Sequence, residues 1–466
     1  MYIFSKEKTM ILLKHIHRLL FSIVSLFSVF TFGQNPVTPN LPVLPVPTSA
    51  QIFNYTTPTV TVLNKKNETP VPIYPLVMQN SQQRQNQNLI QETERHESLW
   101  EKTMNEASAD IAEMHSTIWY QLPSSSNREG TSFYRQAFDK IVMDCIYSIK
   151  DNNFLIENAF YDNKLDKSKF DKTIRNSGKL LVSKIKESGY DPNSNTTKNF
   201  MLFRFFSETL QLKNSKDKHL PLKYDFEDYM GTQDYSKMFV TKLIRTGSGQ
   251  CHSMPLLYLI LAEEIGAEAY LALSPNHSYI RFPDDNGKWY NVELTNGMFS
   301  TESYISQSGY VKSEALGNNI YMSNLSKKEL LSKHLSDLAE GYIHKFGYDE
   351  FAQSVINKAL ELYPNSISAN MINANIATAR VQSVLQQLGI NTFDAKQREK
   401  ILHYPKAVVL LKEMHRQYAL IDNLGYEHMP PEEYQRWLQS MKGEKQKKEN
   451  EAISKQFEGV LTKQKQ

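Results

Sequence analysis

Three residues of types that act together in thiol chemistry follow one another in the middle of this chain of 466 residues: Cys251, His277 and Glu293. Cys251 comes directly after the glycine-rich segment Gly247-Ser-Gly-Gln and before an apolar stretch. A thiol attacks a carbonyl only as the thiolate, and a helix N-terminus or a nearby imidazolium lowers its ordinary pKa of about 8.5. A cysteine at the start of a helix, followed by a histidine and an acid on strands, is the order that a cysteine acyl-transfer site requires.

The histidine of such a site needs a partner for its second ring nitrogen, which sets the tautomer and the orientation of the ring. Glu293 and Asn291 lie two residues apart on one expected strand, so both side chains point to the same face and either could orient His277. His252 adjoins Cys251, but neighbours on a helix do not face each other. We therefore expect His252 at the rim of the site.

The elements that must position these residues can be read from apolar runs and turn residues. A helix is expected from about Ser253 to Gly266, with Pro255 in its first turn, where a missing N–H is harmless. Gly247 and Gly249 let the chain turn sharply into it. Strands are expected at 267–273, 278–282 and 289–294, the last two joined by the hairpin turn Asp284-Asp-Asn-Gly287. One helix packed on a small antiparallel sheet predicts an α+β core.

The pattern Gly249-Gln-Cys251, His277 and Trp289-Tyr-Asn-Val-Glu293-Leu-Thr295 resembles the transglutaminase-like superfamily, which has a papain-type fold. The run from Cys251 to Glu263 is similar to the SirB-like bacterial branch, whose members often carry tetratricopeptide repeats. This resemblance covers about residues 235–300. It implies Cys251 as nucleophile, His277 as base and Glu293 as orienting acid, in the place where the family usually has Asp.

Two functions follow from this interpretation. The first is an enzyme that performs thiol-dependent acyl transfer or amide hydrolysis on a peptide or protein substrate. The second is a transglutaminase-like binding or scaffold protein that has lost catalysis. The chain contains only two cysteines, so a Cys145–Cys251 disulfide is the structural alternative to a reactive thiol. Hydrolysis and cross-linking differ only in the access of water or amine, and the sequence leaves both open.

The N-terminus predicts export. Residues 1–33 combine a basic start with the apolar run 19–32 and a small residue, Gly33, which is typical of a signal peptide; a single membrane anchor is the alternative. The formal net charge of +3 comes from this segment, which holds four basic residues and one acidic residue. The remainder has no basic excess for nucleic acid or anionic lipid. We expect a periplasmic or extracellular protein without stable membrane insertion after signal cleavage.

The remaining regions are expected to be a linker and helices. Residues 34–84 are rich in proline and form an extended, disordered linker. An N-terminal helical region is expected at 85–234, with a stripe from Met104 to Ile118 and segments at 133–150, 167–188 and 197–212. The core spans 235–325, and residues 441–466 form a charged tail.

Residues 326–440 resemble tetratricopeptide-repeat helices; a generic helical hairpin is the alternative. Their small residues predict close packing of paired helices and a groove for a protein partner, with no part in a catalytic step. These residues are Ala339, Ala352, Ala359, Ala369 and Ala374. The sequence contains no phosphate-binding loop, nucleotide fingerprint or metal-ligand spacing. We expect neither a cofactor nor a metal site.

Overall fold

The computed structural model describes residues 118–143, 147–295, 297–301, 309–391 and 399–440, with the single positions or short pieces 88, 90–92, 95, 394, 397 and 455. The expected signal peptide, the linker, Cys145, most of the Met104–Ile118 stripe and nearly all of the charged tail lie outside these residues. Among the helices described, none is long and apolar enough to cross a membrane.

Between residues 118 and 234, four helices precede the core: α5 (Thr131–Met143), α6 (Ile149–Phe160), α7 (Lys167–Glu187) and α8 (Asn195–Ser207). The single helix expected at 133–150 is wrong. Helix α5 ends at Met143, and α6 starts anew at Ile149, because the side chain of Ser148 accepts a hydrogen bond from the backbone of Asp151 as an N-cap. Asp166 and Ser194 cap α7 and α8 in the same way.

The core is a mixed α+β arrangement. A short helix, α9 (Val240–Thr246), leads into α10 (Ser253–Ile265), which ends at Gly266 in the left-handed conformation, as expected. The sheet is antiparallel in the order β3-β4-β5-β6. Its strands are β3 (Tyr270–Ser274), β4 (His277–Pro283), β5 (Trp289–Glu293) and β6 (Met298–Ser300). The hairpin at Asp284–Gly287 forms as predicted, whereas β6 was not foreseen.

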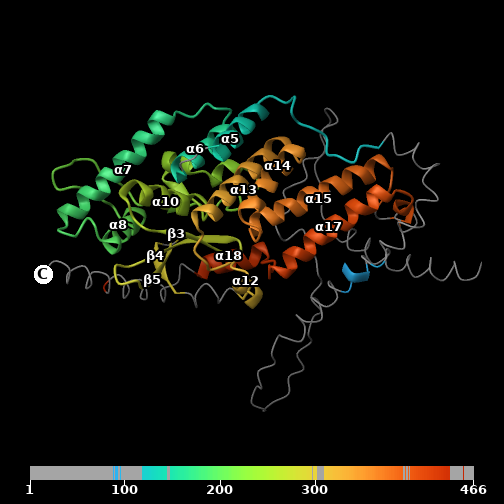
Figure 1. Ribbon diagram of the computed structural model, residues 1–466. Helices are drawn as coiled ribbons and strands as arrows, with labels where there is room; N and C mark the ends of the chain where they lie inside the picture. Colours follow the sequence, from blue (N-terminus) through green and yellow to red (C-terminus); the bar gives the residue numbers. More distant parts are fainter. Residues whose placement is uncertain are drawn as a thin grey trace, which may run out of the picture.

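Helix α10 is the central element of the core. It contacts β3 and β4 of the sheet as well as α7 and α8 of the preceding helical layer (Figure 1). All ten residues from Ser253 to Ala262 are buried. A helix that is buried on every side has no face in contact with water, so this segment can be apolar on every side.

The C-terminal half is helical: α12 (Ser313–Gly317), α13 (Lys327–Phe346), α14 (Glu350–Leu362), α15 (Ile367–Gln387), α17 (Pro405–Asn423) and α18 (Pro431–Ser440). A capping box between Ser326 and Glu329 starts α13. The five alanines singled out in the sequence are all fully buried, so they serve helix packing and do not line an exposed groove.

The C-terminal helices share hydrophobic cores with the rest of the molecule. Leu338 and Tyr342 of α13 pack in one cluster with Tyr134 of α5 and Ile156 of α6. Helix α18 returns to the side of the sheet (Figure 1), where Tyr434 joins the core around α10. Two apolar cores therefore run across the expected boundaries at 234/235 and 325/326.

Candidate active site

The backbone before Cys251 has a conformation that depends on two glycines. Gly247 ends α9 with φ of +68°, a left-handed conformation in which a glycine costs least. A Cβ on Gly249 would lie 2.7 Å from the Ser253 side-chain oxygen and 2.9 Å from a Leu243 methyl group. The predicted sharp turn is thus confirmed, and it places Cys251 two residues before the first residue of α10.

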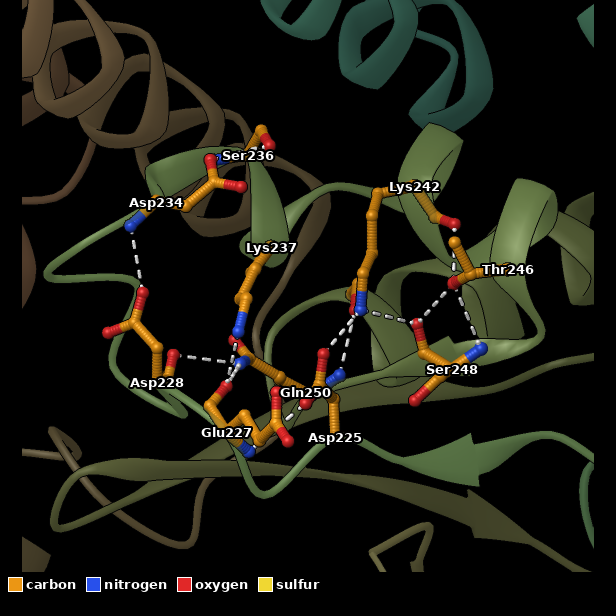
Figure 2. Close-up of polar contacts among 11 residues, drawn as sticks. Asp225, Glu227, Asp228, Asp234, Ser236, Lys237, Lys242, Thr246, Ser248 and Gln250 are labelled. Atoms are coloured by element: carbon orange, nitrogen blue, oxygen red, sulfur yellow. Dashed lines mark hydrogen bonds and ion pairs between the residues drawn. The ribbon is translucent and has the colours of Figure 1, made fainter.

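A polar network holds this turn from the outside (Figure 2). The ammonium group of Lys242 binds the Asp225 carboxylate at 2.6 Å and the Ser248 carbonyl at 3.0 Å. The side-chain amide of Gln250 donates to the Asp228 carbonyl at 2.9 Å. These bonds attach both sides of the turn to the preceding loop, so that the backbone on either side of Ser248 is fixed.

His277 heads β4 after a turn at Asn276, whose φ is +55°. Its Nε2 lies 2.6 Å from Oε2 of Glu293 at the end of β5. Ile280 pairs with Val292 in the sheet, and extending this register brings Glu293 to the face that carries His277. The hydroxyl of Ser278 donates to the Cys251 carbonyl, which ties β4 to the start of α10.

The structure separates the two candidates for the orienting residue. Glu293 accepts from the backbone N–H of Thr295 at 2.9 Å through its other carboxylate oxygen, so its position is fixed at both oxygens. Asn291 is buried, and its side-chain oxygen instead accepts from Nε of Arg281 at 3.1 Å. The prediction that Glu293, not Asn291, bonds to His277 is confirmed.

A tyrosine that the sequence did not indicate lies between the thiol and the imidazole. The Tyr434 hydroxyl donates to Sγ of Cys251 at 3.5 Å and lies 3.0 Å from Nδ1 of His277. Trp437, one turn later on α18, packs edge-on to the His277 ring at 4.9 Å. Residues 326–440, for which no part in a catalytic step was expected, therefore bring two side chains to the site. Tyr434 follows His277 by 157 residues, and no local motif connects them.

The charges in the site favour an ion pair between thiolate and imidazolium. Burial raises the pKa of the Cys251 thiol, but the hydrogen bond and charge of His277 outweigh it and the pKa lies below its ordinary value. Burial lowers the pKa of His277, but the charge of Glu293 and the bonds to Cys251 and Glu293 raise it well above its ordinary value. Burial, followed by the charges of Cys251 and Tyr224, raises the pKa of Tyr434, so its hydroxyl remains a donor.

The site is closed in this conformation. Cys251, His277 and Glu293 are 8%, 6% and 3% exposed, and Tyr434 is fully buried. The segment that covers them is held at a second point, because the side-chain amide of Asn276 donates to the Met429 carbonyl at 2.9 Å. Helix α18 and the segment before it thus cover the side of the thiol that Tyr434 contacts.

The thiol itself is free, so the Cys145–Cys251 disulfide is absent from this structure. His252 is not a rim residue. Its ring is largely buried, and Nε2 lies 3.1 Å from the Asp337 carboxylate on α13. The described residues contain no group of three or more His, Cys, Asp or Glu side chains that could hold a metal ion.

Comparison with known proteins adds no relative to this description: no family model, no curated protein and no solved structure matches the chain.

Proposed function

We propose that this protein is a thiol-dependent enzyme that transfers an acyl group from, or hydrolyses, an amide of a peptide or protein. The observation that carries the proposal is the position of His277, whose Nε2 bonds to Glu293 at 2.6 Å while its other side faces the Cys251 thiol. A buried histidine between a carboxylate and a free thiol is the arrangement that generates a thiolate near neutral pH.

In the proposed reaction, Sγ of Cys251 attacks the amide carbonyl and the C–N bond breaks. The His277 imidazolium gives its proton to the leaving amine, which yields a thioester and a neutral imidazole. Water or a second amine then attacks the thioester and gives a proton to His277, and the C–S bond breaks to restore the thiolate–imidazolium pair. Glu293 holds the ring and stabilises its charge throughout. The N-terminus of α10 directs positive potential at the oxyanion.

The transglutaminase-like assignment belongs to the same proposal. It is supported by the order of Cys251, His277 and Glu293, and by a helix with the cysteine before it packed against an antiparallel sheet. We also propose export to the periplasm or the exterior, on the basis of residues 1–33, and a protein partner for the repeat-like helices α13 to α15. Mass spectrometry of the protein from its host tests the first of these, with Gln34 as the expected N-terminus.

A binding protein without catalysis is the second candidate, and the position of Tyr434 favours it. Its hydroxyl contacts both the thiol and the imidazole, the two groups that a substrate would have to reach. In this alternative the three buried polar residues serve to hold α18 in place.

Turnover distinguishes the two candidates. The mature protein is incubated with a glutamine-containing protein and a fluorescent primary amine, and amine incorporation, ammonia release and peptide cleavage are followed together. An enzyme gives at least one product, retains it in the matched control Cys145→Ser and loses it in Cys251→Ala. A binding protein gives none of the three products under any condition, including those that displace α18.

A further inference from the structure

A second group of buried charges lies beside the nucleophile, and the reaction proposed above does not use it. His252 directly follows Cys251, and its ring is held at both nitrogens. Nδ1 lies 3.0 Å from the Met238 carbonyl, and Nε2 lies 3.1 Å from Oδ2 of Asp337. The side chains of His252 and Asp337 are 19% and 5% exposed, so water screens this pair weakly.

The two partners of His252 determine its charge. A neutral imidazole carries one N–H and one lone pair. If the proton sits on Nδ1, a lone pair faces the Asp337 carboxylate; if it sits on Nε2, a lone pair faces the Met238 carbonyl. Only the imidazolium combines a hydrogen for the Met238 carbonyl with a positive charge facing the Asp337 carboxylate. In agreement with this geometry, burial lowers the pKa of His252, but the charge of Asp337 more than compensates and leaves the pKa above its ordinary value.

Other titratable side chains of α13 surround this pair. Asp337 also pairs with Lys333, so two cations share one carboxylate. Burial lowers the pKa of His334 to about 4, which makes that ring neutral at neutral pH. Burial raises the pKa of Glu340, whose carboxyl oxygen accepts a hydrogen bond from the Tyr235 hydroxyl at 3.4 Å.

We propose that His252 is a positioning residue, a cation fixed by Asp337 and the Met238 carbonyl that stabilises the thiolate of Cys251. Neighbouring side chains on a helix do not face each other, but in a poorly screened interior a charge acts over several ångströms without contact. The charge of His252 is among the influences that lower the pKa of Cys251, after those of His277 and Tyr434. Through Asp337, helix α13 of the C-terminal half thus contributes to the ionisation of the nucleophile.

The inference rests on the proposed function, because it assumes that the thiolate is the reactive form, but its test needs no substrate. The rate of alkylation by iodoacetamide is measured against pH in the full chain carrying Cys145→Ser, so that only Cys251 reacts. We expect His252→Gln to raise the thiol pKa by about one unit, which reduces the thiolate fraction about tenfold at low pH. His252→Lys retains the charge and should restore most of the effect.

His334→Gln is the matched control, because it removes a buried but neutral ring from the same cluster and should leave the thiol pKa unchanged. Equal thiol pKa values in His252→Gln and the parent would overturn the proposal, as would equal shifts in the Gln and Lys variants. The parent protein provides a test that does not depend on variant folding. Nitrogen-15 shifts should show a His252 ring protonated at both nitrogens at pH 7, and a neutral ring contradicts the inference.

The outcome can be separated from that of the proposed function. If His277→Ala leaves the thiol pKa unchanged while His252→Gln raises it, the Cys251–His277 pairing fails and the role of His252 stands. If His277→Ala raises the thiol pKa and His252→Gln does not, the Cys251–His277 pairing stands and the role of His252 fails.

Discussion

The Tyr434 hydroxyl lies 3.0 Å from Nδ1 of His277 and donates to Sγ of Cys251 at 3.5 Å. With Nε2 of His277 bound to Glu293, the imidazole has a hydrogen-bond partner at each nitrogen. A tyrosine that donates to the sulfur accepts from the ring, so this chain of bonds matches an ionised pair of thiolate and imidazolium. The same tyrosine is fully buried against both groups, so that stabilisation of the nucleophile and closure of the site depend on one side chain.

Replacement of Tyr434 by phenylalanine should raise the thiol pKa. The hydroxyl lowers the pKa of Cys251 by donating to it, and a hydrogen bond to a charged group is worth about 1.5–3 kcal/mol, or roughly one to two pKa units. The measurement is the pH dependence of alkylation in Cys145→Ser. Tyr229→Phe is the control, because the Tyr229 hydroxyl donates to the Pro431 carbonyl and not to the thiol. An unchanged thiol pKa in Tyr434→Phe would show that the hydroxyl does not bond to the sulfur in solution.

Removal of the negative charge of Glu293 should lower the upper limit of the pH range in which the enzyme is active. The charge of Glu293 raises the pKa of His277, so Glu293→Gln lowers it, and the imidazolium is lost at a lower pH. The acid limb, which follows the thiol, should not move upward, because His277 is still protonated at that pH and a nearby negative charge has been removed. The profile of kcat/KM against pH measures both limbs.

Asn291→Ala is the matched control for this profile. It removes the bond to Arg281 and should cost about 1 kcal/mol of stability, with both limbs unmoved. If the alkaline limb moves in Asn291→Ala and not in Glu293→Gln, the assignment of the orienting residue is incorrect.

A chain that ends at residue 428 should fold and expose the thiol. Among the described side chains, Met429, Tyr434 and Trp437 of the removed segment belong to the core around α10, and the other described cores contain no residue after Tyr426. We expect alkylation by a bulky maleimide to accelerate at least tenfold, and alkylation by iodoacetamide to accelerate less. The two rates and a circular-dichroism melt are the measurements. If alkylation by both reagents accelerates equally, the truncation has destabilised the whole fold and has not simply uncovered the thiol.

A chain that ends at residue 325 should aggregate. It lacks α13, whose Leu335, Leu338 and Tyr342 fill the core that α5 and α6 share. Loss of several such side chains costs about 2–5 kcal/mol each, which exceeds the stability of an ordinary domain. A monomeric, cooperatively melting product would instead show that the C-terminal helices are an independent module, as the repeat pattern suggested.

Gly249→Ala should destabilise the protein by about 1–3 kcal/mol, because the new methyl group overlaps Ser253 and Leu243. Gly287→Ala is a suitable comparison, since space around it is open and only its φ of +81° is unfavourable. Urea unfolding measures both free energies. A Gly249→Ala protein as stable as the parent would mean that the turn before Cys251 relaxes easily.

Much of the site followed from local patterns. The turn at Gly247 and Gly249, the helix that ends at Gly266 and the hairpin at Asp284–Gly287 were all predicted, because each depends on residues a few positions apart. Glycine is favoured where φ is positive, and an apolar helix ends where its periodicity stops. The order of Cys251, His277 and Glu293 along the chain was likewise the basis for predicting a thiol site.

The tertiary structure decided what local patterns could not. Asn291 and Glu293 share one strand face, and only the sheet register and the bond to Arg281 assign Glu293 to His277. Tyr434 reaches the thiol because α18 packs against the core, and His252 meets Asp337 because α13 lies beside the start of α10. These contacts join residues that are far apart in sequence. Their energy comes from burial against surfaces that exist only after the whole chain has folded, so no short segment records them.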